Sequence, residues 1–259
     1  MLLIHESERK FRVAAKLAPE PLGLRERKKH DSLARMRAAA RALMWDRGYD
    51  DVTTKEIAAH ADVGEATLFR YFPSKLDLFL VVYGEEFEKV IDACSKNDAK
   101  YDGIKTADAN EYVTRILASY RRFAELYVLY PDLAYTFVKE SFGSHSDVGQ
   151  SGLAHADRWF ELLEAIVRQA QSARAFAPVD PATVVQNCHA LYVHEVLRSH
   201  ARGLPSADMP ERLLHRLEAL LCPLQILPKN QWLKQLATIQ PGSTEPSTRR
   251  HARRTATGR

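Results

Sequence analysis

The 259-residue sequence lacks the features of several large classes of protein. It contains no run of eighteen apolar residues, so we expect no membrane-spanning helix. Its first residues, Met1 to Glu6, have neither the basic stretch nor the long apolar stretch of a secretory signal. The three cysteines (Cys94, Cys188 and Cys222) are too widely spaced for a disulfide framework, and we interpret them as free thiols of a cytoplasmic protein.

Motifs of enzymatic chemistry are also missing. The sequence has no glycine-rich phosphate loop, no Gly-x-Ser-x-Gly elbow and no dinucleotide fingerprint. His194-Glu195 is not followed by the second histidine of a helical zinc site, and the cysteines are not clustered. We therefore expect no catalytic residues, no metal site and no cofactor.

The sequence does contain helical periodicity. Apolar residues recur at three- and four-residue spacing, alternation typical of strands is scarce, and only 11 residues are glycine. We therefore predict an all-α chain, for which 46% hydrophobic residues supply a substantial core. A loop is expected at 97–106 and a Gly/Ser-rich break at 143–152. The expected helices span about residues 30–47, 54–61, 65–72, 74–95, 109–129, 132–142, 153–175, 181–202, 208–221 and 230–239.

Two helix-capping signals lie close together in the first third of the chain. Thr53 precedes Glu56 by three positions, and Ser74 precedes Asp77 by the same interval. In a capping box the hydroxyl accepts an amide hydrogen bond, while the acid accepts one from the amide of the cap residue. The spacing predicts helices that begin at Thr54 and directly after Ser74.

Between these signals the sequence predicts a tight turn. Asp62-Val63-Gly64 ends the first short helix, Gly64 can cap the second, and Pro73 cannot continue it. Leu68 and Phe72 are four residues apart and should face inward, which leaves an outer side of polar and basic residues. Two short helices joined by a tight turn are the layout of a DNA-reading helix-turn-helix.

These residues together resemble the TetR/AcrR family of bacterial transcription regulators over about residues 25–82. The resemblance implies an N-terminal three-helix helix-turn-helix domain, followed by a C-terminal helical domain for ligand binding and dimerisation. The matching segments are Arg25-Glu26-Arg27-Lys28-Lys29, Arg47-Gly48-Tyr49, Thr53-Thr54, Ile57-Ala58, Asp62-Val63 and the run from Thr67 to Lys75.

The resemblance also implies which residues contact DNA. Thr53 and Thr54, at a helix start, would touch phosphate, while Tyr71 and Lys75 would hold the DNA backbone on either side of the recognition helix. The full set of candidates is Thr53, Thr54, Lys55, Glu65, Ala66, Thr67, Phe69, Arg70, Tyr71 and Lys75.

Two residues depart from the family pattern. Phe69 stands where tyrosine is often found, so a hydroxyl contact is lost while a ring able to meet a thymine methyl remains. Gly64 replaces a serine-type cap, which should make the start of the recognition helix less firm.

Charge is unevenly distributed along the chain. Residues 1–80 carry 15 Lys/Arg and 12 Asp/Glu, residues 81–228 carry 15 and 20, and residues 229–259 carry 7 and 1. Basic ends around an acidic middle fit a DNA-binding head on an acidic body. The predicted divisions are an N-terminal extension (1–24), a DNA-binding domain (25–82), a ligand-binding and dimerisation domain (83–228) and a basic, largely disordered tail (229–259). The extension is an ordered arm, a disordered one or the result of an upstream start codon. The tail adds nonspecific DNA affinity or only solubility.

In the family that this sequence resembles, the body encloses a small-molecule cavity, and the last two long helices pair with those of a second subunit. Aromatic residues at helical spacing are candidates for the cavity, although such a stripe is more often plain core. His189 is likewise more often a satisfied core histidine. The ligand candidates are Tyr120, Phe123, Tyr127, Trp159, His189 and Tyr192. The dimer candidates, on the helices at 180–203 and 208–221, are Val184, Leu191, Leu213, Leu217 and Leu220.

Three function classes follow from these observations. The favoured one is a homodimeric repressor of a palindromic operator in double-stranded DNA, released by a small, mainly apolar ligand. The second is a DNA-binding protein without an inducer, either constitutive or controlled by a protein partner. The third is an α-helical enzyme. An aromatic-lined cavity would favour the first class, and a solid body would favour the second.

Overall fold

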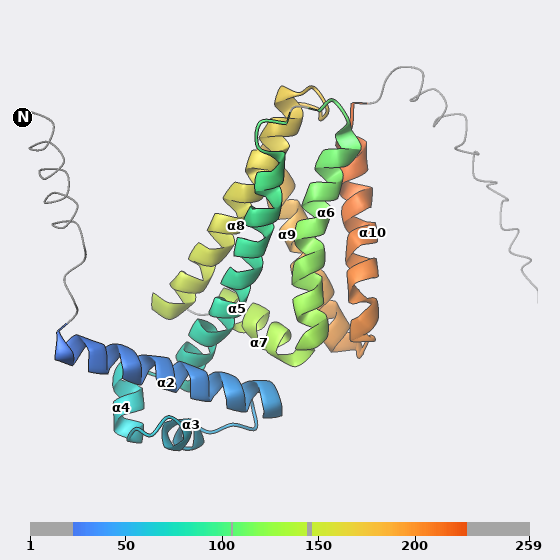
Figure 1. The fold of residues 1–259 in the computed structure, drawn as a ribbon. Helices are drawn as coiled ribbons and strands as arrows, with labels where there is room; N and C mark the ends of the chain where they lie inside the picture. Colours follow the sequence, from blue (N-terminus) through green and yellow to red (C-terminus); the bar gives the residue numbers. More distant parts are fainter. Residues whose placement is uncertain (1–22, 105, 144–146, 227–259) are drawn as a thin grey trace, which may run out of the picture.

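The computed structural model describes residues 23–104, 106–143 and 147–226, which form helices joined by short connections (Figure 1). The only β-type pairing within these ranges is an isolated antiparallel bridge between Phe176 and Gln225. The predicted all-α fold, a helix-turn-helix head followed by a helical body, is confirmed. The α-helices are α2 (Leu24–Arg47), α3 (Thr54–His60), α4 (Glu65–Tyr71), α5 (Lys75–Asp98), α6 (Ala109–Leu129), α7 (Pro131–Gly143), α8 (Asp147–Ser172), α9 (Pro181–Arg202) and α10 (Met209–Leu221). Short 3-10 turns follow at η1 (Ala99–Tyr101), η2 (Ser206–Asp208) and η3 (Cys222–Leu224).

Most predicted boundaries lie within a few residues of the observed ones, and two differ more. α2 begins at Leu24 rather than near residue 30, because exposed charged residues with good helix propensity extend it without apolar periodicity. α8 begins at Asp147 rather than near 153, despite the Gly/Ser-rich sequence there. It packs on α5 and α9, and burial of a long amphipathic helix outweighs the ~1 kcal/mol that each glycine costs. The predicted helix at 230–239 lies outside the described residues.

The head consists of α2, α3, α4 and the first turns of α5, at one end of the molecule (Figure 1). α3 and α4 have seven residues each, so packing rather than their own hydrogen bonding keeps them helical. The turn between them is closed by the Val63 amide, which donates to the Ala58 carbonyl at 3.0 Å. The fully buried side chains of the head core come from all four helices and include Met36, Met44, Ile57, Leu68 and Leu78.

α5 belongs to both halves of the protein. It starts in the head, where it packs on α2, and continues into the body beside α6 and α8 (Figure 1). Arg41 of α2 lies 2.5 Å from Glu85 and 2.9 Å from Glu86 of α5, and Arg37 lies 3.2 Å from Glu85. A displacement of α5 within the body would therefore also move its first turns, against which α2 of the head packs.

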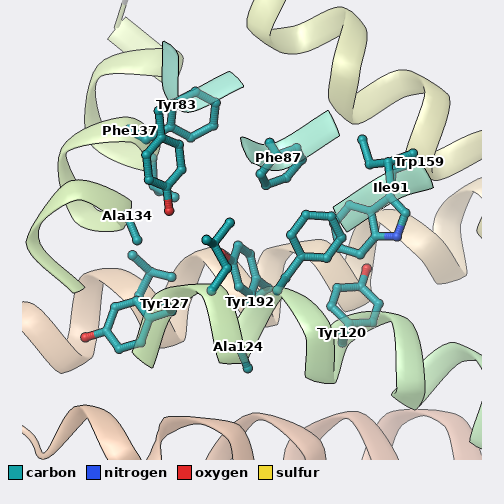
Figure 2. Packing of buried hydrophobic residues seen from close by; sticks show 14 of the residues in the cluster. Tyr83, Phe87, Ile91, Tyr120, Ala124, Tyr127, Ala134, Phe137, Trp159 and Tyr192 are labelled. Atoms are coloured by element: carbon teal, nitrogen blue, oxygen red, sulfur yellow. The ribbon is translucent and has the colours of Figure 1, made fainter. Parts of the chain in front are cut away.

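The body is built from α6 to α10 around the remainder of α5. α6 packs on α10, α8 packs on α5, and α9 contacts α7, α8 and α10. Buried aromatic rings from α5, α6, α7, α8 and α9 fill the space between these helices (Figure 2). Over the part of the chain that the structure describes, no helix combines the length and the apolar character needed to cross a membrane.

Candidate DNA-binding surface and interior aromatic cluster

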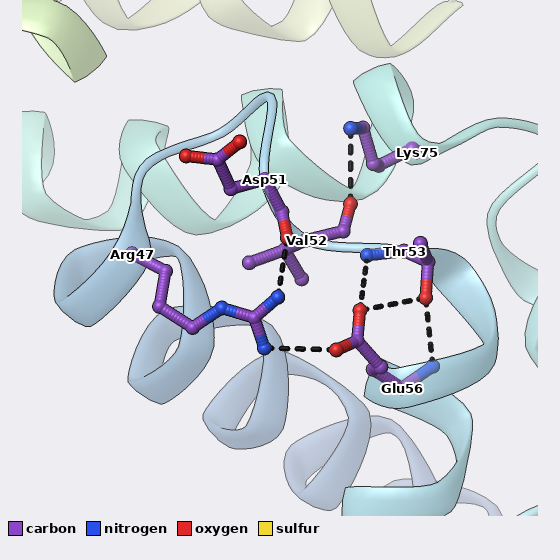
Figure 3. Close-up of polar contacts among 6 residues, drawn as sticks. All are labelled: Arg47, Asp51, Val52, Thr53, Glu56 and Lys75. Atoms are coloured by element: carbon purple, nitrogen blue, oxygen red, sulfur yellow. Dashed lines mark hydrogen bonds and ion pairs between the residues drawn. The ribbon is translucent and has the colours of Figure 1, made fainter.

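α3 begins at a network of hydrogen bonds (Figure 3). Thr53 Oγ1 accepts from the Glu56 amide at 3.2 Å, and Glu56 Oε2 accepts from the Thr53 amide at 2.8 Å, so the predicted capping box is confirmed. Arg47, the last residue of α2, donates to Glu56 Oε1 at 2.8 Å and to the Asp51 carbonyl. Hydrogen bonds from Arg47, and then from Thr53, lower the pKa of Glu56 to about 2. The start of α3 is therefore fixed to the end of α2.

Lys75 follows the second predicted cap, where Ser74 Oγ accepts from the Asp77 amide at 3.0 Å. Its Nζ donates to the carbonyls of Tyr49, at 2.9 Å, and Val52, at 3.0 Å, the second of which is drawn in Figure 3. Nζ also lies 4.2 Å from the centroid of the Tyr49 ring. The ammonium group thus holds the loop between α2 and α3. Sequence analysis assigned Lys75 to the DNA backbone and missed this internal role.

α4 presents its outer side to solvent. Leu68 is fully buried beneath the helix, whereas the Phe69 residue is 42% exposed, so this large apolar ring is not used by the core of the head. The other candidates on α4 are exposed (Glu65, Ala66 and Arg70) or half-buried (Thr67 and Tyr71). The helix therefore offers a ring surrounded by polar and charged groups.

Residues of α3 and α2 lie on either side of α4. At the start of α3, Thr53 and Lys55 are exposed, and the half-buried Thr54 donates from its hydroxyl to Glu65 Oε1 of α4 at 2.7 Å. The first turns of α2 and the side of α4 line one surface groove, whose residues are Arg25, Glu26, Lys28, Lys29, Ser32, Thr67, Arg70 and Tyr71. All ten predicted DNA-contacting residues are thus exposed or half-buried, and Lys75 differs from the other nine in that its ammonium group is bonded to two backbone carbonyls.

Five of the six predicted ligand residues gather in one aromatic cluster inside the body (Figure 2). The ring centroid of Trp159 lies 4.1 Å from that of Phe123, 4.7 Å from that of Tyr120 and 5.7 Å from that of His189. Tyr192 joins through His189, with centroids 6.0 Å apart. These centroid distances are those of rings packed against one another. The sixth candidate, Tyr127, lies at the opposite side of the view in Figure 2.

Three polar atoms of this cluster are buried without a hydrogen-bond partner: Tyr120 Oη, Trp159 Nε1 and His189 Nδ1. An unpaired buried polar group costs ~1–3 kcal/mol. Burial lowers the pKa of His189 to about 4, so its imidazole is neutral at pH 7. Sequence analysis favoured a core histidine whose ring nitrogens are hydrogen-bonded. His189 Nδ1 has no such hydrogen bond. Burial also raises the pKa of the neighbouring Cys188 thiol to about 12, which keeps it unreactive.

The five predicted dimer residues do not share an outer face. Val184, Leu213 and Leu217 are buried in their own subunit, with 6%, 0% and 0% exposure, so they have almost no free surface to offer a second subunit. Leu191 and Leu220 are half-buried. The apolar residues of α9 and α10 do recur at helical spacing, but they pack against helices of the same subunit. The exposed stripe of α9 consists instead of Thr183, Asn187, Ala190, His194, Leu197 and Ala201.

A buried carboxylate that sequence analysis missed joins α9 to α10. Glu195 is fully buried, with Oε1 2.9 Å from Arg216 Nε and Oε2 3.3 Å from Arg212 Nε. Arg198 lies 3.9 Å from the same carboxylate, and Arg212 donates to Ser199 Oγ at 2.8 Å. The available signal was that Glu195 is the only acidic residue between positions 181 and 202. Its partners on α10 could not be read from spacing within one helix.

The capped α3, the exposed outer side of α4 and the basic start of α2 define a helix-turn-helix DNA-binding protein with a helical body. Among residues 23–226, leaving out the gaps named above, no group of three or more His, Cys, Asp or Glu could hold a metal ion.

Comparison with known proteins places the similarity in the head. Residues 37–82 match the family described as bacterial regulatory proteins, tetR family. The HTH-type transcriptional repressor KstR of Mycolicibacterium smegmatis is 38% identical over 88 residues, which cover 34% of this chain and 37% of that protein. KstR of Mycobacterium tuberculosis is 37% identical over 101 residues, which cover 38% and 40%. The match thus spans about two fifths of the length of these curated relatives. Both relatives are named as transcriptional repressors.

Similarity to a solved structure extends over most of the body. The crystal structure of Thermus thermophilus FadR, described as a TetR family transcriptional repressor in complex with lauroyl-CoA, aligns with a TM-score of 0.60. The alignment covers 76% of this chain and 96% of that one, at 21% sequence identity. At this identity the similarity establishes the fold of head and body.

Proposed function

We propose that this protein is a homodimeric transcriptional repressor, which binds a palindromic operator and is released by a small, mainly apolar ligand. The observation that carries the proposal is the outer side of α4, where the exposed Phe69 ring lies among polar side chains on a helix short enough to enter a major groove. The names of the curated relatives support the repressor role.

Phosphate contacts and base contacts come from different residues in this proposal. Thr53, the start of α3 and Lys55 hold the DNA backbone, since hydroxyls, helix N-termini and lysines fix register on phosphates. Thr67 and Phe69 reach base edges, and the Phe69 ring meets a thymine methyl. Lys75 supports them indirectly by holding the loop before α3, because two of its N–H groups are already bonded to backbone carbonyls.

The dimer forms through the exposed stripe of α9 rather than through the residues that the sequence suggested. Ala190 and Ala201 allow a second subunit to approach closely, and Leu197, which is 38% exposed, offers an apolar contact. A two-fold axis beside this stripe would present two α4 helices to major grooves about 34–36 Å apart along the DNA.

Aromatic contacts provide a route from the interior cluster to the head. A ligand that enters the cluster must displace rings, and the displaced rings pack on α5. Lys75 covers the last ring of the series, Tyr49, which lies next to the helix-turn-helix. Successive ring centroids along this route are 4.1 Å (Trp159–Phe123), 4.3 Å (Phe123–Phe87), 5.7 Å (Phe87–Phe137), 4.7 Å (Phe137–Tyr83), 5.7 Å (Tyr83–Phe79) and 4.9 Å (Phe79–Tyr49) apart.

The ligand acts only if it binds the DNA-incompetent state more tightly than the DNA-binding state. A hundredfold loss of operator affinity requires roughly 2.8 kcal/mol of coupling between the two sites. The close ring packing is also the one observation that favours the second candidate function. A body that stays closed would belong to a DNA-binding protein that is constitutive or controlled by a protein partner.

The test starts with the full chain and a random library of duplex DNA. Selection should recover a site with two inverted half-sites, and sedimentation should give a dimer at micromolar concentration. A monomer bound to an asymmetric site would contradict the proposal.

Thr67→Ala should change the preference among half-site variants, whereas Phe69→Ala should weaken binding and relax the preference for thymine. Ile104→Ala is the matched control for Phe69→Ala, because Ile104 is 51% exposed and lies beyond η1, away from the head.

A further inference from the structure

Half of the buried, unpartnered side-chain atoms among the described residues belong to residues of one aromatic cluster. Six such atoms occur, and the other three are Arg41 Nε, Ser141 Oγ and Glu195 Oε1, which lie elsewhere. Arg41 Nε and Glu195 Oε1 are within 2.9 Å of an oppositely charged side chain. Tyr120 Oη, Trp159 Nε1 and His189 Nδ1, by contrast, have no compensating charge contact of this kind.

These three residues come from three different helices and touch through Trp159. Tyr120 belongs to α6, Trp159 to α8 and His189 to α9. The Trp159 ring lies 4.7 Å from Tyr120 and 5.7 Å from His189, and Figure 2 shows the Tyr120 hydroxyl directed toward Trp159. A core built only for packing would not need the polar atoms, because phenylalanine could fill much of the same space. A small molecule with a polar atom between the three helices would give each orphaned group a partner.

We propose that Tyr120, Trp159 and His189 bind a neutral oxygen, a hydroxyl or a ketone, of an otherwise apolar ring compound. This inference rests on the proposed function and defines the chemistry of its ligand. The indole N–H can only donate, and the phenol and one tautomer of the imidazole can also donate, so an acceptor oxygen is the atom that all three groups can bind.

The aromatic surroundings favour an uncharged group on the ligand. The rings packed around the three residues are Phe87, Phe123, Phe160 and Tyr192, all of them uncharged. A carboxylate at this position would be buried without a cation, which is far more costly than burying a neutral hydroxyl that is hydrogen-bonded. The same rings are the wall against which an aromatic or alicyclic body would pack. Phe87 and Phe123 begin the ring route to the head, so a ligand held here displaces the residues that α5 contacts.

Three naphthalene probes of similar size test the proposal on the full chain. 2-Naphthol carries a neutral hydroxyl, 2-methylnaphthalene replaces it by a methyl group, and 2-naphthoate carries a charge. Isothermal titration should show 2-naphthol binding roughly tenfold more tightly than 2-methylnaphthalene, as expected for one or two hydrogen bonds to otherwise unpaired groups, and 2-naphthoate binding most weakly. Equal affinities for the first two probes, tighter binding of the naphthoate, or no binding by any probe up to its solubility limit would overturn the inference.

Two tyrosine variants separate the hydrogen bond from packing. Tyr120→Phe removes an unpaired hydroxyl, so it should abolish most of the preference for 2-naphthol while leaving the thermal stability of the free protein unchanged or higher. Tyr127→Phe is the control, because the Tyr127 hydroxyl is hydrogen-bonded to Ser199. It should lower thermal stability and leave the preference intact. Similar loss of preference in both variants, or in neither, would contradict the assignment. So would a crystal structure in which an ordered water bonds the three atoms and remains there with 2-naphthol bound.

Operator binding measured in parallel distinguishes this inference from the proposed function. If oxygen-free compounds release the operator as well as 2-naphthol does, the repressor proposal stands and the oxygen site is wrong. If the chain selects no DNA sequence while 2-naphthol binds as expected, the oxygen site stands and the repressor proposal is wrong.

Discussion

The head and the body of this protein are stabilised in different ways. In the head, side chains fix short helices by bonding to nearby backbone groups, as Thr53, Glu56 and Lys75 do. In the body, long helices are held together by buried rings, and the polar atoms of Tyr120 and Trp159 lie among those rings unpaired. In the head, the capped starts of α3 and α5 and the bonds from Lys75 hold the surface around α3 in one conformation. An interior that contains unpaired polar atoms would gain free energy from a second arrangement in which those atoms are hydrogen-bonded.

Removal of a central ring should produce the largest effect. Trp159 is fully buried and contacts rings from α5, α6 and α9. Trp159→Ala should therefore lower the free energy of unfolding by ~3–5 kcal/mol, measured by urea denaturation. Trp159→Phe, which keeps most of the ring contact, should cost much less. A loss below about 1 kcal/mol for the alanine variant would show that the cluster is not a packed core.

Acid should destabilise the body through His189. Its folded pKa of about 4 lies below the ordinary value of 6.5, so the unfolded chain takes up a proton first as the pH falls. The stability that depends on a neutral His189 is fully present above pH 6.5. It is lost as the pH falls from 6.5 to about 4, and the total loss in unfolding free energy is roughly 3 kcal/mol.

The histidine variants make this pH dependence testable. His189→Gln should flatten the dependence of the unfolding free energy in that window, whereas His215→Gln, at an exposed position of α10, should not change it. Parallel curves for the wild type and His189→Gln would contradict a buried, neutral imidazole.

The same contrast explains how much of the structure could be predicted from the sequence. The starts of α3 and α5 depend on residues three positions apart, Thr53 with Glu56 and Ser74 with Asp77, so local spacing located them. The ion pair between Arg47 and Glu56 and the bonds from Lys75 to the loop before α3 join residues on different elements, which spacing does not reveal.

In the body, the sequence located most helices but not their neighbours. The apolar faces of α9 and α10 were identified correctly, yet periodicity does not say whether the same subunit or another covers a face. Leu213 and Leu217 were therefore assigned to a dimer interface, although they lie in the core of their own subunit. The aromatic cluster was found because ring residues are rare and recur at helical spacing. Its unpaired atoms depend on how three helices meet.

Lys75→Met should have a smaller effect, located in the head. The variant removes two hydrogen bonds to the carbonyls of Tyr49 and Val52, so we expect a loss of ~1–3 kcal/mol in unfolding free energy. The slope of operator affinity against salt should stay close to that of the wild type. Lys55→Met, at an exposed position of α3, should reduce that slope by about one unit and leave stability unchanged. A reduced slope for Lys75→Met would instead support the contact with a DNA phosphate that sequence analysis predicted for Lys75.

Glu56→Gln should give the smallest effect, because Arg47 and Glu56 are 40% and 42% exposed and solvent screens their interaction. The folded pKa of Glu56 is about 2, below its ordinary value of 4.5, so the capped α3 favours the carboxylate. The contribution to stability is complete above pH 4.5 and is lost as the pH falls toward 2. Melting temperatures across this range should therefore fall less steeply for Glu56→Gln than for the wild type. Glu211→Gln, an exposed carboxylate on α10, serves as the control and should keep the wild-type slope.

Because His189 acts mainly above pH 4 and Glu56 below pH 4.5, the two variants should alter different parts of one acid-unfolding curve. A change in the same part of the curve for both variants would show that head and body do not respond to acid separately.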